Sequence, residues 1–238
     1  MPTIASKTVL LCSLLLILSA ACQSEKGFLN ISKHSSNQTL SSGYAKDVSS
    51  IILHDFMIYH HQDRSATAKD QLTNLSFKTG KIMEDSTVSI TSLFYRELLS
   101  RGFQVNLADS STRRELNIDS SFDKETFIKQ ATANKSFQES DLILTGIIYR
   151  YEDKIGSSIS IDKASSVAFS VVLISKSEGR TIFEAGFDKE QQSLFSDLTE
   201  FKFFAKGGFK WLTALELSSL AVEKLVDKLP VQPISNKK

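Results

Sequence analysis

The sequence predicts a single α/β domain, an α+β sandwich in which helices pack on a mixed sheet. Strand-like and helix-like apolar patterns alternate over residues 49–230. Two consecutive strand patterns, 166–175 and 180–188, are separated by a short loop that contains glycine and suits an antiparallel hairpin. Residues 213–229 carry the apolar stripe of a closing helix. Hydrophobic residues make up 41% of the 238-residue chain and charged residues 23%, a composition typical of globular domains.

The first half of the domain is expected to hold two strands and two helices. Residues 51–59 are apolar and open with β-branched side chains, as in a buried strand. The polar stretch that follows is expected to be irregular up to Asp85, which can cap a helix that runs to Ser100. Residues 103–107 alternate like a strand, and residues 123–134 show a weaker helical pattern.

The second half is expected to hold three strands and the closing helix. Residues 141–151 form a long apolar strand pattern. Residues 166–175 alternate between an apolar and a small polar face, which fits an antiparallel sheet covered by helices on one side. In the closing helix, Thr213 can act as the cap and Glu216 follows three residues later, as in a capping box.

The first 22 residues have the layout of a bacterial secretory signal. Lys7 gives a positive start, and residues 8–18 form an apolar run of about 11 residues, fewer than the roughly 20 that a membrane-spanning helix needs. Small residues 19–21 then precede Cys22, which resembles the lipobox of bacterial lipoproteins. The resemblance implies that residues 1–21 are removed, that Cys22 receives a diacylglycerol group, and that a further acyl chain such as palmitate follows.

Two other interpretations of this region remain open. The chain could be an ordinary secreted protein cut at an Ala-x-Ala site, with Cys22 incidental. It could also be a eukaryotic secreted glycoprotein, because Asn-x-Ser/Thr sequons occur at Asn30, Asn37, Asn74 and Asn134. Under the lipoprotein interpretation Cys12 leaves with the signal, so the mature chain has no free thiol. No cofactor is then expected beyond the covalent lipid on Cys22.

The segments that flank the domain are expected to lack structure. Residues 22–48 are rich in Ser, Asn and Gln and predict a flexible tether behind the lipidated cysteine. Residues 231–238 are polar and predict a loose tail. Gln23 follows the cysteine, which resembles the outer-membrane address of enterobacterial lipoproteins. The expected location is therefore the periplasmic face of the outer membrane, with two or three acyl chains as a stable anchor.

Three motifs of the domain match a known group of periplasmic proteins. A helix ends at Gly102 and leads into a Phe-x-Val strand, residues 141–146 place an acid and apolar residues before Thr-Gly, and residues 173–183 form a hairpin with a Gly turn. Over residues 50–190 the chain thereby resembles the α/β domain shared by the curli-secretion lipoprotein, the lipoprotein activators of penicillin-binding proteins and the amino-terminal domain of TolB. The resemblance implies a lipid-anchored accessory protein.

Catalytic and metal-binding patterns are weak in this sequence. A cluster of possible ligands contains His54, Asp55, His60, His61 and Asp63. His54 and Asp55 would point to opposite faces of a strand, and no Glu-x-x-His or Cys-x-x-Cys spacing supports a metal site. Nucleophile elbows and Gly-rich phosphate loops are also missing from the sequence, so we expect no metal and no enzyme. The net charge of +1 gives no support to a nucleic-acid-binding function, which needs a basic face.

The most unusual part of the sequence is residues 191–212. Its candidate partner-binding side chains are aromatic: Phe201, Phe204, Phe209 and Trp211, the only tryptophan. These rings could fill the core, or they could form a docking surface, because Trp and Phe beside basic residues are typical interface anchors. A second candidate is the strand end at Tyr149 and Tyr151, which leads into a polar loop.

The predicted function is that of a non-catalytic accessory or scaffold lipoprotein. It would bind a protein partner in transport, secretion or cell-wall assembly, and it could form a homo-oligomer. One alternative is an envelope hydrolase or small-ligand-binding lipoprotein, which a pocket around His54, Asp55 and His60 would favour. Another is a subunit of an outer-membrane secretion pore, which would need amphipathic strands of about 9–11 residues.

Overall fold

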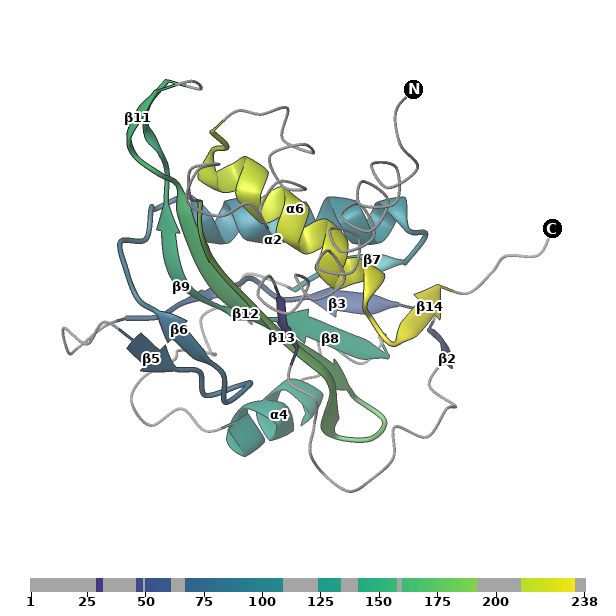
Figure 1. The fold of residues 1–238 in the computed structure, drawn as a ribbon. Helices are drawn as coiled ribbons and strands as arrows, with labels where there is room; N and C mark the ends of the chain where they lie inside the picture. The colour runs from purple at the N-terminus through teal and green to yellow at the C-terminus, as the bar shows by residue number, and fades with distance from the viewer. Residues whose placement is uncertain are drawn as a thin grey trace, which may run out of the picture.

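A computed structural model describes most of the predicted domain. The described residues are 29–31, 46–48, 50–60, 67–108, 124–133, 141–157, 160–191 and 211–233. They form a mixed sheet with helices α2 (Ser86–Ser100) and α6 (Ala214–Asp227) on one face (Figure 1). Helix α4 (Lys124–Ala133) and the hairpin of β5 (Thr67–Lys69) and β6 (Ser76–Lys78) pack on the other. The expected α/β class, with helices on a mixed sheet, is confirmed. None of the described helices is both long and apolar enough to cross a membrane.

Eight of the described strands form the main sheet. They are β1 (Leu29–Ile31), β3 (Ile51–Leu53), β4 (Met57–Ile58), β7 (Val105–Leu107), β8 (Leu142–Thr145), β9 (Ile147–Glu152), β12 (Ser166–Ser175) and β13 (Arg180–Glu190). The order is β1-β13-β12-β8-β3-β7, and β9 and β4 continue the rows of β8 and β3. β12 and β13 pair along their whole length as the expected antiparallel hairpin, whose turn contains Gly179 with φ of 60°. β3 pairs in parallel with β7 and β8.

One glycine divides the sheet into two sections. The sequence predicted single strands at 51–59 and 141–151, but each is interrupted. Gly146 separates β8 from β9, because a Cβ atom there would lie 1.9 Å from the carbonyl oxygen of Ser170 on β12. The neighbouring strand breaks at the same level: β3 pairs with β8, β4 pairs with β9, and Phe56 between them donates its N–H to Thr91 Oγ1 of α2 at 3.2 Å.

The other described strands form three small sheets. β5 (Thr67–Lys69) and β6 (Ser76–Lys78) make an antiparallel hairpin inside the stretch expected to be irregular. β10 (Ile155–Gly156) and β11 (Ile161–Lys163) extend β9 and β12 as a two-stranded ribbon. β2 (Lys46–Val48) pairs in parallel with β14 (Val231–Pro233). Strands β1, β2 and β14 thus lie in the segments expected to be tether and tail.

The described helices agree closely with the sequence patterns. They are α2 (Ser86–Ser100), α4 (Lys124–Ala133) and α6 (Ala214–Asp227). Thr213 caps α6 as expected: its hydroxyl accepts the Glu216 N–H, and the Glu216 carboxylate accepts the Thr213 N–H at 2.8 Å. Asp85 precedes α2, but its side chain makes no capping hydrogen bond.

The sheet is covered on both faces and not only on the one side that the sequence predicted, so even the small polar side chains of β12 are buried. On one face α2 and α6 cover a cluster that includes Phe56, Phe94 and Phe169. On the other, α4 and the β5–β6 hairpin cover a second cluster that includes Phe77 and Phe127. All ten residues of β12 are buried, because this strand is central and has cover on both sides.

Candidate partner-binding surface

The two segments that the sequence singled out for partner binding meet at one end of the sheet. Lys154, at the start of the ribbon, donates from Nζ to the carbonyl oxygen of Trp211 at 2.5 Å. The neighbouring carboxylate of Asp153 accepts the N–H of Ala214, in the first turn of α6, at 3.0 Å. These two contacts hold the ribbon base against the start of α6. They bring together regions that are about sixty residues apart in sequence.

Apolar side chains are exposed on both sides of this junction. Ile155 of the ribbon is 57% exposed and Leu215 of α6 is 45% exposed, while Trp211 is half-buried. Figure 1 shows the ribbon of β10 and β11 extending beyond the sheet on the side of α6. We call Lys154, Ile155, Trp211 and Leu215 the ribbon surface. An apolar centre with a lysine at its margin has the composition of a protein-binding surface.

Both ends of the aromatic segment are fixed beside the ribbon surface. Gln191, at the end of β13, accepts the Leu212 N–H through Oε1 at 2.8 Å and donates its own N–H to Ser165 at 3.0 Å. Gln191 and Leu212 are both buried. Phe201, Phe204 and Phe209 lie between these two points, outside the described residues. Their role as binding residues therefore stays a prediction.

The other two predicted contact residues lie in the core and not on the surface. Tyr149 is 1% exposed and Tyr151 is 3% exposed. A bulge in β9, where Ile148 pairs with Phe169 but Arg150 pairs with Ala168, sends the two rings to opposite faces of the sheet. Alternation in the sequence placed them at a strand end, but that end is covered on both faces. Neither ring is available to a partner in this conformation.

Tyr149 is held by a buried polar contact and by two aromatic rings. Its hydroxyl donates to Asp70 Oδ2 at 2.9 Å, and its ring stacks on Phe77 at 4.7 Å between centroids. The ring of Tyr59 lies 5.0 Å away at a tilt. Burial, followed by the nearby Asp70 charge, raises the pKa of Tyr149 well above its usual range. This residue therefore links the β5–β6 hairpin to the sheet as a neutral hydrogen-bond donor.

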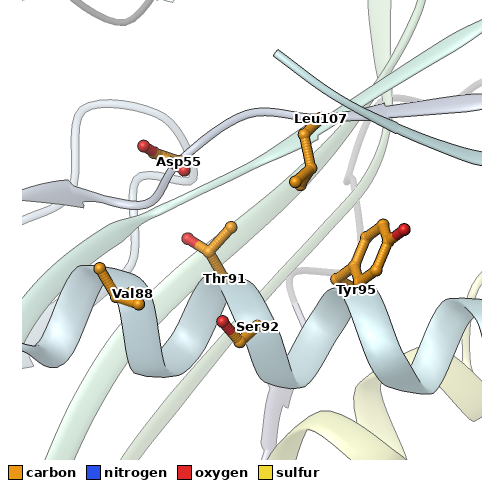
Figure 2. Close-up of a pocket in the computed structure, with 6 residues that line it drawn as sticks. All are labelled: Asp55, Val88, Thr91, Ser92, Tyr95 and Leu107. Atoms are coloured by element: carbon orange, nitrogen blue, oxygen red, sulfur yellow. The ribbon is translucent and has the colours of Figure 1, made fainter. Parts of the chain in front are cut away.

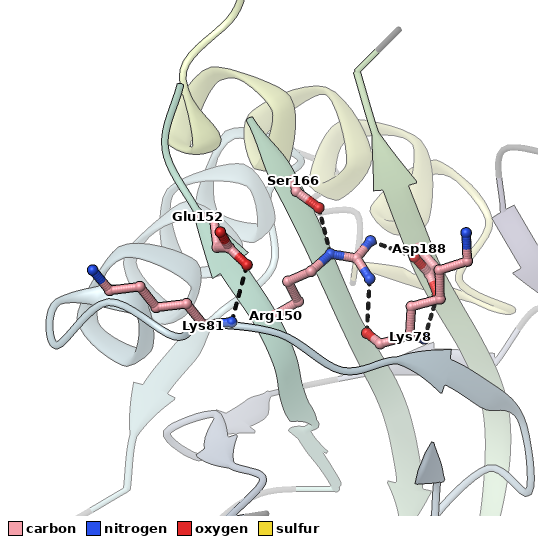
Figure 3. A network of polar contacts seen from close by, with 6 residues as sticks. All are labelled: Lys78, Lys81, Arg150, Glu152, Ser166 and Asp188. Atoms are coloured by element: carbon pink, nitrogen blue, oxygen red, sulfur yellow. Dashed lines mark hydrogen bonds and ion pairs between the residues drawn. The ribbon is translucent and has the colours of Figure 1, made fainter. Parts of the chain in front are cut away.

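The buried side chain of Arg150 joins β6, β12 and β13 near the base of the ribbon. The side chain is 6% exposed, and its Nη2 and Nη1 atoms donate to Asp188 at 2.6 Å and to the Lys78 carbonyl at 2.8 Å (Figure 3). Its Nε atom donates to the Ser166 hydroxyl. Gly80 lets the chain lie directly on this side chain, because a Cβ atom there would be 2.6 Å from Arg150 Cδ. The charge is thus fully engaged in structural contacts.

Glu152 extends this network toward the ribbon. Its carboxylate accepts the Lys81 N–H at 3.0 Å and pairs with the Lys163 ammonium group of β11. Burial opposes ionisation of Glu152, but the hydrogen bonds from Lys163 and Lys81 outweigh it and lower its pKa. No pattern in the sequence predicts these contacts, because Lys81 lies 71 positions from Glu152 and Lys163 lies across the ribbon on β11.

A shallow hollow of about 210 Å³ lies between α2 and the adjoining strands (Figure 2). It is lined by Asp55, Val88, Thr91, Ser92, Tyr95 and Leu107. His54 is 2% exposed and its Nδ1 atom contacts the Asp55 carbonyl at 2.9 Å, so it does not line the hollow. His60 is exposed elsewhere, and His61 and Asp63 lie outside the described residues. Among the residues that the structure describes, no three His, Cys, Asp or Glu side chains could hold a metal.

No protein-family model matches the chain, and no curated protein matches its sequence. Solved structures with a similar arrangement include the PelC dodecamer from Paraburkholderia phytofirmans. The sequence identity is 13%, the match covers 79% of this chain and 92% of that chain, and the TM-score is 0.45. Lipoprotein GNA1162 from Neisseria meningitidis has 9% identity, 68% and 96% coverage and a TM-score of 0.36. The LpoB C-terminal domain from Escherichia coli has 12% identity, 61% and 86% coverage and a TM-score of 0.30. Structural similarity at these TM-scores does not indicate what the chain does.

Proposed function

We propose that this protein is a lipid-anchored accessory protein of the bacterial envelope that binds a protein partner through the ribbon surface. The observation that carries the proposal is the junction of β10 with the start of α6, where Ile155 and Leu215 are exposed around Trp211. Large apolar side chains on a rigid support bind partners without losing much conformational freedom. The Lys154 and Asp153 contacts and the Arg150 network supply that support.

The anchor would act together with this surface. Acyl chains on Cys22 would confine the domain to one membrane, which raises its effective concentration toward a partner in the same envelope. The periplasmic face of the outer membrane is the location that Gln23 favours. The proposal includes no hydrolase activity, because the sequence has no nucleophile elbow and no Gly-rich phosphate loop.

Replacing Ile155 by aspartate is expected to lower partner recovery at least tenfold in crosslinked envelopes. A charge in an apolar interface centre loses burial and must be desolvated, and central residues of interfaces cost about 2 kcal/mol or more when changed. The measurement is quantitative mass spectrometry of proteins crosslinked to the full-length lipoprotein, with Trp211→Ala as a second variant.

Val88→Asp is the matched control, because Val88 is 68% exposed and lines the hollow, which contains no residue of the ribbon surface. Its recovery should stay within twofold of the wild type. If Ile155→Asp and Trp211→Ala both recover the partner normally, the ribbon surface is not the binding site. Crosslinks between two copies of the chain that disappear in the same variants would identify the partner as a second copy.

Replacing Cys22 by alanine is expected to move the protein almost completely from the membrane fraction to the soluble fraction. The described helices cannot cross a membrane, so attachment would depend on the acyl chains. The measurement is palmitate labelling together with fractionation. A wild-type protein that takes up no label, or a mature chain that begins at another residue, would refute the anchor.

A small-ligand-binding function is the second candidate, because the hollow combines the Asp55 carboxylate with hydroxyl groups of Thr91, Ser92 and Tyr95 (Figure 2). This candidate predicts that Val88→Asp impairs the function of the protein in cells, whereas Ile155→Asp does not. The two variants therefore separate the two functions.

A further inference from the structure

We infer that the β5–β6 hairpin and the adjoining edge of β13 form the face that the domain turns toward its membrane, where lysines of the hairpin contact anionic lipid headgroups. The inference rests on the lipid anchor at Cys22 proposed above. It starts from strand β1, which the sequence had assigned to a flexible tether. Leu29, Asn30 and Ile31 pair with Phe187, Gly186 and Ala185 at the outer edge of β13.

The pairing of β1 leaves a short connection to the anchor. Seven residue steps separate Cys22 from Leu29, and a chain of this length reaches at most about 25 Å in any conformation. A domain of this size is about 40 Å across. The edge of β13 that holds β1 must therefore stay near the bilayer, and the domain cannot present the opposite edge of the sheet, at β7, to the membrane. Without β1, the tether would run from Cys22 to β2 and could reach more than twice as far.

The β5–β6 hairpin lies directly beside this attachment point. Gly186, the partner of Asn30, lies under the ring of Phe77: a Cβ atom on Gly186 would be 2.6 Å from Phe77 Cζ. The Lys78 N–H donates to Asp188 of β13 at 2.8 Å. The hairpin packs on the sheet face opposite α2 and α6. The surface that the hairpin exposes thus adjoins the point where the anchor leaves the domain.

That exposed surface is polar and carries positive charge. Ala68 and Phe77 point into the core, so the alternate residues Thr67, Lys69, Ser76 and Lys78 face outward. Two of these four side chains are lysines and none is acidic. Each lysine next to an anionic bilayer strengthens binding about fivefold. The ribbon surface lies beside α6, on the other side of the sheet, so this orientation leaves it accessible to a partner in the periplasm.

The test attaches the mature chain to vesicles chemically, so it does not depend on lipidation in cells. Cys22 is the only thiol after residue 21, and it can be coupled to a maleimide lipid. Two single-tryptophan reporters are made in a Trp211→Phe background: Ser76→Trp on the hairpin and Ser219→Trp on the exposed side of α6. Lipids with a nitroxide on the headgroup quench tryptophan at short range.

In neutral phosphatidylcholine vesicles, the tryptophan at position 76 should be quenched at least twice as strongly as the tryptophan at position 219. Twelve Gly and Ser residues inserted between Lys26 and Gly27 extend the reach to about 65 Å and should remove the difference. Equal quenching of the two reporters with the native linker would overturn the inferred orientation. Lack of palmitate on Cys22 in cells would refute the anchor and leave this vesicle result unchanged.

The long-linker variant then tests the lysines. In vesicles with 30% phosphatidylglycerol, preferential quenching at position 76 should return. The double substitution Lys69→Gln and Lys78→Gln should remove it again. Each lysine that is lost should lower the ratio of docked to undocked protein about fivefold. Lys78 contributes only backbone atoms to its contacts with Arg150 and Asp188, so the substitution leaves them intact. Lys228→Gln, at the exposed end of α6, is the control. If the preferential quenching at position 76 is unchanged when both hairpin lysines are replaced, the headgroup contact is overturned.

Discussion

Replacing Asp70 by alanine is expected to lower the free energy of unfolding by about 3–5 kcal/mol. Asp70 is fully buried, and its Oδ1 atom accepts the N–H groups of Leu72 and Thr73, each at 2.6 Å. Its Oδ2 atom accepts the Tyr149 hydroxyl at 2.9 Å. Alanine would leave three buried donors without an acceptor, and each such donor costs about 1–3 kcal/mol. The loss should be greatest in the β5–β6 hairpin, which Asp70 joins to the sheet.

Urea unfolding of the mature chain, followed by circular dichroism, measures the change. Asp70→Asn keeps the shape and one acceptor, so it should cost about 1–2 kcal/mol. Asp162→Ala, at an exposed position of β11, should change stability by less than about 0.5 kcal/mol. An Asp70→Ala protein as stable as the Asp162→Ala protein would show that the buried carboxylate contributes nothing to stability.

Replacing Gly146 by alanine is expected to cost more than about 3 kcal/mol, because the added methyl group has no space. It would lie 1.9 Å from the Ser170 carbonyl oxygen and 2.5 Å from Phe56 Cε1. The first contact is with the backbone of the central strand, which cannot move without breaking its pairing with β13. The total free energy of unfolding of many domains is only about 5–15 kcal/mol, so the variant is expected to be partly unfolded at 37 °C.

Gly179→Ala separates lack of space from backbone strain. Gly179 has φ of 60°, but a Cβ atom there meets nothing within 4 Å. Its replacement should cost only about 1–2 kcal/mol, the penalty of a left-handed conformation. Thermal unfolding of both variants compares the two costs. Equal melting temperatures would mean that the sheet adjusts at Gly146 and that the close contact with Ser170 is not a constraint.

Local signals were sufficient to predict the helices and the long hairpin. Helix α6 begins after Thr213 because Thr213 and Glu216 satisfy each other's backbone donors within four residues. The hairpin of β12 and β13 needs only two long apolar runs and a glycine in the turn. In each case the residues that determine the helix or hairpin lie within it, so the local sequence pattern is sufficient to predict it.

The short strands could not be predicted, because their causes lie elsewhere in the chain. β5 and β6 form because Asp70 is buried against Tyr149, which is 79 positions away, and the polar residues around Asp70 look like a loop. β1 has three residues and depends on a free edge of β13. A strand of this length has almost no periodicity to recognise, so only its partner reveals it.

The candidate site residues that the sequence suggested differ in their burial. Trp211 was chosen from residue type, and the structure places it half-buried in contact with Lys154 at the start of the ribbon, so its role in binding stays a prediction. Tyr149 and Tyr151 were assigned to a surface because they precede a polar loop, but both faces of the sheet are covered at that end by residues distant in sequence. Leu215 was not identified, since a single leucine in the first turn of a helix is ordinary in either setting.

The parallel pair of β2 and β14 also constrains the order in which the chain can be completed. Residues 46–48 are synthesised before every strand of the main sheet except β1, and their partners at 231–233 are synthesised after all of them. A nascent chain must therefore carry an unsatisfied strand until the rest of the fold has emerged. A chain that ends before residue 231 would leave β2 without this partner, and an unpaired strand edge can pair with another chain.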